Sequence, residues 1–328
     1  MALDFFPFPY RTFDVGLQKP YPTLSAALDA FYLGRDLRMR MQQRSAGLQK
    51  HIKTNIARLE KKRAMMLETL QESEKAEQYR VFGELLTANL HLVAKGAAQA
   101  EVVNYYDEAQ QTLTIPLSTQ LTPAKNAQQY YKKYRKAKGA EQYAREQLLT
   151  IAAELDVLEN ALEDLDKCAT STDLAEIRYV LAENGFIRPE PAARKQKKRQ
   201  EGKPYRFLAP DGTEILVGKN ALQNDRLTLH AQANETWLHA QGIPGSHVIV
   251  RTEREPAPET LLMGAKLAAY YSKGRNHPSL PVDYTLRKYV KKASGAPAGL
   301  VTYNRFQTIL VGLTPEEIVI FSHMAADA

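Results

Sequence analysis

Residues 148–165, LLTIAAELDVLENALEDL, carry apolar side chains at alternating intervals of three and four positions. The positions that form this seam are Leu148, Ile151, Leu155, Leu158, Leu162 and Leu165. Such heptad spacing is typical of a helix that packs along one narrow apolar line against a second helix. The stretch therefore predicts one helix of a coiled coil, and we assign the seam a structural role alone.

A second helical pattern lies nearer the N-terminus, within residues 23–95. Its apolar positions recur every three, four or seven residues, at Leu48, Ile52, Ile56, Leu59, Met66 and Leu70. Two such helices can pack as an antiparallel hairpin, and a helix of about 45 residues projects about 70 Å at about 1.5 Å per residue. We therefore expect a coiled-coil arm, with residues 23–95 as its first helix and residues 138–186 as its second helix and a short third one.

Residues 96–137 separate the two helices and predict a small α/β module at the tip of the arm. Residues 101–106 and 112–117 are β-like runs, and Thr122 followed by Pro123 is a typical helix start. The next helix interleaves tyrosines with cations, which suits RNA because cations hold phosphates and rings stack on bases. The candidate contacts are Tyr131, Lys132, Lys133, Arg135, Lys136 and Lys138. A solvated helix face with tyrosines in the core explains the same pattern.

A strongly basic segment follows at residues 187–204. It comes after a short helix that we expect Ser171 or Thr172 to cap and Gly185 to end. Residues 188–206 contain eight Lys or Arg and two Asp or Glu, so they carry six of the seven net positive charges of the chain. We expect a mobile linker whose candidate phosphate contacts are Arg194, Lys195, Lys197, Lys198 and Arg199. A merely solvated spacer would have the same composition.

Residues 205–328 change to short β-branched and aromatic runs, with helical patterns at residues 220–231 and 258–273. This arrangement predicts an α+β domain with a mostly antiparallel sheet. Residues 1–22, rich in Pro, Phe and Tyr, are expected to be an extended segment. The fold class that we predict for the chain is therefore α+β: a long antiparallel coiled-coil hairpin with a small tip module, followed by this α+β domain.

Residues 236–251, TWLHAQGIPGSHVIVR, place a Ser and two His around a glycine turn. Ser246 and His247 are adjacent, so in a strand they point to opposite faces and cannot form the hydrogen bond of a nucleophile and its base. A catalytic zinc site needs a third protein ligand besides His239 and His247, and no spacing supplies one. The sequence therefore does not favour catalysis at this turn.

We interpret the same stretch as a rigid turn, with Gly242 and Gly245 in unusual backbone conformations. Such a turn would present a rim of Trp, His and Arg side chains suited to stacking and phosphate contact. The candidate residues are Trp237, His239, Ser246, His247 and Arg251. The alternative is that Trp237 and His247 are simply core residues.

The composition sets limits on function. Lys and Arg number 44 against 37 Asp and Glu, a net charge of +7, which favours an acidic partner such as RNA. The single cysteine, Cys168, excludes an intrachain disulfide and a Cys-rich zinc site. We see no signal-peptide pattern, no apolar run long enough to span a membrane, and no P-loop or dinucleotide fingerprint. We expect a cytoplasmic protein that is not an enzyme and has no metal, no cofactor and no membrane partner.

Several long motifs resemble the NFACT family. The motifs GTEILVGKNALQNDRLTL, WLHAQGIPGSHVIVR and VDYTLRKYVKKASGAPAGLVTY resemble its C-terminal NFACT-R domain. Residues 101–138 resemble its coiled-coil middle module, and YPTLSAALDAFY resembles the start of its first coil. The resemblance implies RNA binding by the domain at 205–328, and it adds as candidate contacts Asn220, Asn224, Asp225, Arg287, Lys288, Lys291 and Lys292.

The resemblance implies a role in ribosome-associated quality control. Family members bind large ribosomal subunits that carry an obstructed nascent chain, and bacterial members recruit alanine-charged tRNA to direct a template-free alanine tail. It also implies that the arm reaches the stalk base of the subunit. The family's N-terminal domain, which mainly recognises the tRNA, is expected to be missing, so we expect this chain to be a piece of a longer protein.

Two departures and one competing hypothesis accompany the resemblance. Asn234 and Glu235 precede the tryptophan where members often have Asp, and Pro297 replaces a Lys, which weakens any RNA contact at that position. The family's older name suggests a fibronectin-binding surface adhesin, against which the basic linker and the absence of a signal pattern speak. An enzyme that acts on nucleic acid would need a constellation of acid, base and metal that we do not find.

Overall fold

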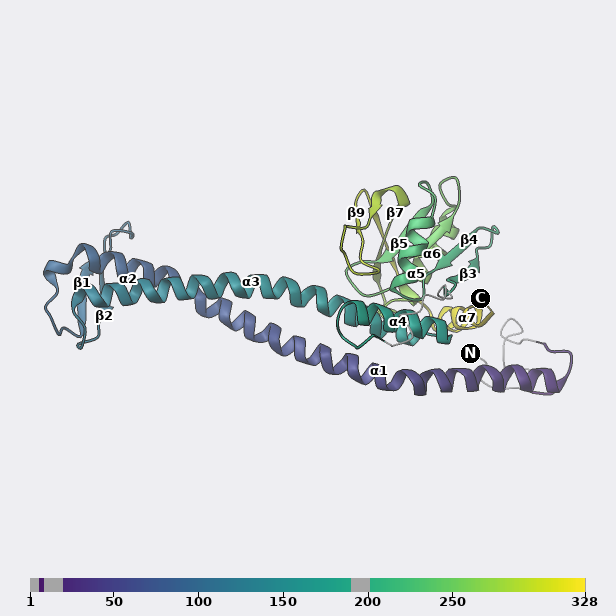
Figure 1. Cartoon of the computed structure of the whole chain (residues 1–328). Coiled ribbons are helices and arrows are strands. Elements are labelled where there is room, and N and C mark those ends of the chain that lie inside the picture. Colours follow the sequence, from purple (N-terminus) through teal and green to yellow (C-terminus); the bar gives the residue numbers. More distant parts are fainter. Residues whose placement is uncertain (1–5, 9–19, 190–200, 328) are drawn as a thin grey trace. The chain divides into compact units, whose positions relative to one another are not determined.

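The computed structural model describes residues 6–8, 20–189 and 201–327 (Figure 1). The chain divides into two compact units, one formed by Ala57–Leu155 and the other by Met1–Ile56 together with Asp156–Ala328. Most of the expected extended segment lies outside the described residues. So do five candidate contacts of the basic linker, Arg194, Lys195, Lys197, Lys198 and Arg199.

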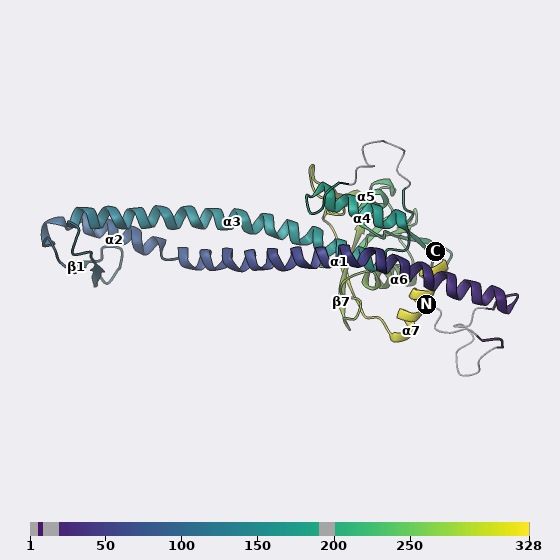
Figure 2. The same cartoon turned by 60° about the horizontal axis from the view of Figure 1, so that its bottom comes forward.

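Two long helices dominate the unit Ala57–Leu155. Within it, α1 (Leu24–Ser73) and α3 (Pro123–Lys167) run antiparallel and side by side in both views (Figures 1 and 2). Leu59 and Ile151 are buried, and Nζ of Lys62 donates a hydrogen bond to Oε1 of Gln147 at 2.7 Å. The helical hairpin that the heptad spacing predicts is confirmed.

The first helix ends earlier than we expected. It stops at Ser73 instead of near residue 95, and a two-residue turn leads into α2 (Ala76–Ala88) and the 3-10 turn η2 (Leu90–Leu92). The following strands, β1 (Gln99–Val103) and β2 (Thr112–Pro116), pair as an antiparallel hairpin. The break allows α2 to pack on this hairpin in one buried cluster of Phe82, Leu85, Leu86, Ala100, Val102, Ile115, Ala127 and Tyr130.

The tip helix and the second coil helix, which we expected as separate segments, are one continuous helix, α3. Its start is as predicted, because the backbone N–H of Lys125 donates to Oγ1 of Thr122 at 3.3 Å and Pro123 is the first helical residue. In the other unit, α4 (Ser171–Glu183) follows. Its cap is Thr170, one residue before the expected position, and Gly185 ends the helix at φ +75°.

A six-stranded sheet forms the centre of the other unit. Its order is β10-β7-β5-β6-β4-β3, and every neighbouring pair is antiparallel, which confirms the predicted α+β class. The strands are β3 (Tyr205–Leu208), β4 (Glu214–Val217), β5 (Thr236–Ala240), β6 (Val248–Arg251), β7 (Leu280–Leu286) and β10 (Gln307–Val311). A separate two-stranded ribbon consists of β8 (Val290–Lys291) and β9 (Thr302–Tyr303).

Helices cover both faces of this sheet. On one face, Leu238 and Val248 pack against α6 (Pro258–Tyr270) and against Phe321 of α7 (Pro315–Asp327) in a single core cluster. Because side chains alternate along a strand, Trp237 and Ile249 point to the opposite face. There they pack with α5 (Ala221–His230) and with the β8–β9 ribbon.

A buried polar network joins α4 to α5. The carboxylate of Glu176 accepts hydrogen bonds from Nδ2 of Asn220 at 2.8 Å, from Nε2 of Gln223 at 2.9 Å and from the guanidinium of Arg226. Asn220 also caps α5 by accepting from the backbone N–H of Gln223. The last turns of α3 join the same core, because Oδ2 of Asp164 accepts a hydrogen bond from the backbone N–H of Ala221 at 2.9 Å. Among the described residues, no helix is long and apolar enough to cross a bilayer.

Candidate nucleic-acid interface

The glycine turn does not present the exposed rim that we expected. Trp237 is fully buried and His247 is 2% exposed. The Trp237 ring stacks on His239 at a centroid distance of 5.8 Å and meets His247 edge-on at 5.2 Å. This face of β5 and β6 points at α5 and the ribbon instead of at solvent. The prediction of an exposed rim is therefore wrong for Trp237 and His247, which are core residues.

The two glycines of the turn also differ from each other. Gly242 has φ +67°, as expected for a glycine in a tight turn. Gly245 does not have a positive φ; instead, a Cβ there would lie 3.1 Å from Cβ of Ser272 and 3.5 Å from Nε2 of His239. The requirement for glycine at position 245 is close packing, not backbone conformation.

Ser246 and His247 have separate hydrogen-bond partners. Oγ of Ser246, which is fully buried, lies 3.0 Å from Nζ of Lys167, which donates to it. Nδ1 of His247 is hydrogen-bonded to Oγ1 of Thr228 at 2.7 Å. The nucleophile–base pair that the sequence argument disfavoured is not formed.

Neither histidine offers positive charge to a phosphate at neutral pH. Burial, with the nearby Lys167 cation, lowers the pKa of His239 to about 4. Burial and the neighbouring His239 lower the pKa of His247 well below its usual 6.5. Both rings are neutral members of the core around Trp237.

Other candidate contacts are engaged within the domain. Asn224 accepts from the backbone N–H of His247, and Asp225 binds Lys292 and the backbone N–H of Gly299. Arg251 is exposed, but its guanidinium lies 2.9 Å from Oε2 of Glu214 and 3.5 Å from Oε1 of Glu235. These groups, like Asn220, hold the domain together.

A basic corner lies where η4 (Arg287–Tyr289) and the β8–β9 ribbon meet the sheet. Residues 284–314 contain five Lys or Arg and no Asp or Glu. Arg287 donates to the carbonyl oxygens of Thr228 and Leu229 at the end of α5, and Lys292 pairs with Asp225. Lys288 and Lys291 are exposed, and no carboxylate of the described residues pairs with them.

Sequence reasoning missed three members of this corner: Tyr289, Arg305 and Phe306. The guanidinium of Arg305 lies 5.0 Å from the ring centroid of Tyr289, and Nη1 of Arg305 donates to the Tyr289 hydroxyl at 3.1 Å. Phe306 is 45% exposed. The absence of acids from residues 284–314 was the signal that could have found them.

A second set of cations lies in the unit Ala57–Leu155, on the tip part of α3. Lys132, Lys133, Arg135 and Lys136 are exposed as expected, and Lys133 lies over the rings of Tyr79 and Tyr130. Tyr130 is buried and its hydroxyl donates to the carbonyl oxygen of Pro116, so this tyrosine belongs to the core. Tyr131 packs against Gly83, and Lys138 pairs with Glu141 at 3.1 Å.

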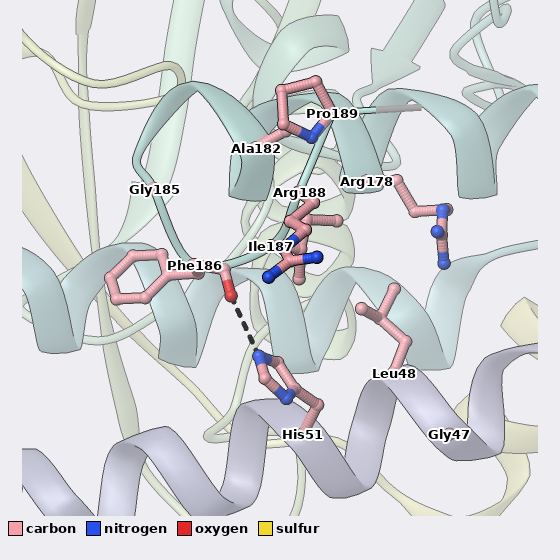
Figure 3. A pocket seen from close by; sticks show the side chains of 10 residues that line it. All are labelled: Gly47, Leu48, His51, Arg178, Ala182, Gly185, Phe186, Ile187, Arg188 and Pro189. Atoms are coloured by element: carbon pink, nitrogen blue, oxygen red, sulfur yellow. Dashed lines mark hydrogen bonds between the residues drawn. The ribbon is translucent and has the colours of Figure 1, made fainter. Parts of the chain in front are cut away.

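A cavity of about 650 Å³ opens between α1 and α4 (Figure 3). Its lining is mostly apolar, with Leu48 and His51 on one side and Phe186 on the other. The imidazole Nε2 of His51 is hydrogen-bonded to the carbonyl oxygen of Phe186 at 2.9 Å. Within the described part of the chain, no three His, Cys, Asp or Glu side chains converge on a metal position.

Comparison with known families matches nearly the whole chain. Residues 2–201 match the NFACT N-terminal and middle domains, and residues 203–304 match the NFACT protein RNA binding domain. The chain belongs to the NFACT family. The NFACT-R match contains the basic corner up to Asn304.

Relatives agree with this assignment. The chain is 39% identical over 307 residues to the Rqc2 homolog RqcH of Bacillus subtilis, covering 92% of this chain and 52% of that protein. It is 36% identical over 303 residues to the Rqc2 homolog RqcH of Streptococcus suis, covering 92% of this chain and 54% of that protein. The chain thus spans about half the length of these two relatives.

A solved structure is also similar to this chain. The C-terminal part of the fibronectin/fibrinogen-binding protein from Streptococcus suis superposes with a TM-score of 0.64 at 32% sequence identity. The alignment covers 85% of this chain and 98% of that one.

Proposed function

We propose that this chain is the RNA- and ribosome-binding part of a cytoplasmic factor for ribosome-associated quality control, without a chemical step of its own. Membership of the NFACT family and similarity to two proteins named RqcH support this role. The observation that carries the proposal is the acid-free basic corner, residues 284–314, most of which lies within the match to the RNA binding domain at residues 203–304. Its exposed Lys288, Lys291 and Arg305 have no carboxylate partner among the described residues, so they are available to phosphates.

In finer terms, we propose binding to large subunits that carry an obstructed nascent chain. The tip of the arm would contact the stalk base through its exposed cations, and the basic corner would contact RNA. Recruitment of alanine-charged tRNA for tailing would rest mainly on the family's N-terminal domain, as the family resemblance implies. Within such a factor, this chain would supply the contacts to the subunit.

Sedimentation with purified ribosomal particles tests the proposal. We expect the chain to pellet with large subunits in preference to small subunits and intact ribosomes. For about five phosphate contacts, log K should fall with log salt at a slope of about −3.5 to −4.5. Equal binding to all three particles, or a flat salt response, would contradict the proposal.

Fibronectin or fibrinogen binding is a second candidate, because the similar Streptococcus suis structure bears that name. Immobilised fibronectin and fibrinogen should retain the chain if this candidate holds. Retention that survives an excess of competing RNA would favour a protein ligand, whereas loss of retention would point to the basic surface alone.

A further inference from the structure

The basic corner contains exposed ring and guanidinium surfaces next to its charges. Both Lys288 and Arg305 lie over the ring of Tyr289, with Nζ of Lys288 at 5.1 Å and Cζ of Arg305 at 5.0 Å from the centroid. Nζ of Lys288 and Cζ of Arg305 are therefore at most about 10 Å apart. The Arg305 side chain adds a planar guanidinium surface. Phe306 follows Arg305 directly and is 45% exposed.

The backbone holds Arg305 in a conformation that few non-glycine residues adopt. Its φ is +51°, in the left-handed region. The turn is fixed from inside the domain, because Oγ1 of the buried Thr285 is 3.1 Å from the carbonyl oxygens of both Asn304 and Arg305. Such conformations persist where the surroundings enforce them, and they concentrate at binding sites.

Phe306 is also positioned by the core. Its ring meets Tyr303 edge-on at 5.3 Å, and Tyr303 in turn lies 4.8 Å from the buried Trp237. The Tyr303 hydroxyl donates to Oδ2 of the buried Asp283 at 2.8 Å. The exposed part of the Phe306 ring is therefore presented by a rigid support and loses little conformational entropy when a ligand stacks on it.

We infer that this corner is a stacking site for unpaired bases of single-stranded RNA, formed by Phe306 and the Arg305–Tyr289 pair. Bases stack on the Phe306 ring and on the Arg305 guanidinium, and Lys288 and Lys291 hold the adjoining phosphates. A duplex would use the cations alone, because its bases are already stacked on one another. The inference rests on the proposed RNA-binding function and names the kind of RNA and the residues that read it.

The test measures affinity by fluorescence anisotropy, using the full chain and a labelled oligouridylate of about 12 nucleotides, within the site sizes of about 4–16 nucleotides of single-strand-binding modules. Phe306→Ala should weaken binding about 5- to 150-fold, the range expected for one stacked base, and leave the salt slope unchanged. Lys288→Ala should lower the salt slope by about 0.7. Arg305→Lys keeps the charge and should still weaken binding, because the planar surface is lost.

Matched variants separate the site from general surface effects. Leu310→Ala removes an apolar side chain on β10 that is even more exposed than Phe306, at 68%, and Arg254→Ala removes an exposed cation flanked by two glutamates. Both should bind oligouridylate within about twofold of the unaltered chain. Thermal melting of each variant shows whether the domain remains folded.

The outcomes distinguish this inference from the proposed function. Unchanged oligouridylate affinity of a folded Phe306→Ala chain overturns the stacking site, while sedimentation with large subunits still decides the proposed function. If Phe306→Ala loses affinity equally for an RNA duplex of similar length, the stacking site is also overturned, because the corner would then bind the RNA phosphate backbone. Failure of the unaltered chain to bind oligouridylate also overturns the stacking site. Displacement of that RNA by polyglutamate overturns it too, because the corner would then be a less selective anion site.

Discussion

Replacing Glu176 with glutamine should destabilise the terminal domain, because this carboxylate is the shared acceptor of the network between α4 and α5. It accepts from the side chains of Asn220, Gln223 and Arg226 and from the backbone N–H of Gly202 at 3.0 Å. The side chain is only 4% exposed. A glutamine amide removes the charge and turns one acceptor into a donor, so at least one buried donor loses its partner.

The expected loss follows from the burial of the two charged partners. Removing one partner of a buried ion pair costs about 3–5 kcal/mol of unfolding free energy. Arg226 is 26% exposed and can regain water, so we expect the lower end, about 3 kcal/mol. In a folding unit of about 150–250 residues, 1 kcal/mol corresponds to about 2–4 °C, so Tm should fall by about 6–12 °C.

Urea denaturation followed by Trp237 fluorescence measures this loss. Trp237 is the one tryptophan of the chain and is fully buried in the sheet, so its emission reports unfolding of this domain. Glu183→Gln, an exposed change on the same helix, is the matched control. Combining Glu176→Gln with Arg226→Met should recover part of the stability, because the guanidinium is then no longer left without its carboxylate. A Glu176→Gln midpoint equal to that of Glu183→Gln would refute the reasoning.

The effect should also depend on pH. Burial alone would raise the pKa of Glu176, but hydrogen bonds from Arg226, Gln223 and Asn220 outweigh it and hold the pKa below its usual 4.5. A lowered folded-state pKa contributes stability that is present above the unfolded pKa and is lost as the pH falls through the folded one. The unaltered chain and the glutamine variant should therefore converge in stability well below pH 4.5.

Three further predictions concern the Trp237 core and the tip. Since His239 and His247 have lowered folded-state pKa values, unfolding free energy should fall as pH drops from 6.5 towards about 4, and His239→Gln should reduce this slope in urea titrations. Gly245→Val should cost about 1–3 kcal/mol by crowding Ser272, and Ser272→Gly should recover part of it in a double-mutant cycle; strict additivity would contradict crowding. Replacing three tip cations with alanine should lower the salt slope of single-stranded RNA binding by about 2 without changing Tm, and an equal slope would exclude the tip as a contact. These cations are Lys132, Arg135 and Lys136.

Much of the fold follows from periodicity in the sequence. The heptad seam places Ile151, Leu155 and Leu158 on one face of α3, and all three are buried. The end of α1 at Ser73 was not predictable in the same way, because no Pro or Gly marks it. The break instead depends on the packing of α2 against a hairpin that begins at Gln99. Such a tertiary contact cannot be predicted from the helix propensities of the residues around Ser73.

The candidate site was only partly predictable. The run Arg287–Lys292 stands out by charge, so Lys288 and Lys291 were found. Arg305 lies 16 positions after Tyr289, and the β8–β9 ribbon brings the two together. The prediction of an exposed rim failed for a related reason. The alternation of side chains along a strand shows which residues share a face with Trp237, but it does not show that α5 covers that face.

The boundary between the two family matches, at residues 201–203, is not a boundary in the folded core. At the N-terminal end of α5, the backbone N–H of Ala221 donates to Oδ2 of Asp164 at 2.9 Å, and Asn220 donates to Glu176 of α4. At the other end of α5, the carbonyl oxygens of Thr228 and Leu229 accept from Arg287, which begins η4 and the basic corner. One short helix therefore connects the last turns of α3 to the surface that we assign to RNA. Hydrogen bonds thus connect the last turns of α3, α4 and the basic corner within one compact unit, although the family matches divide this unit between residues 201 and 203.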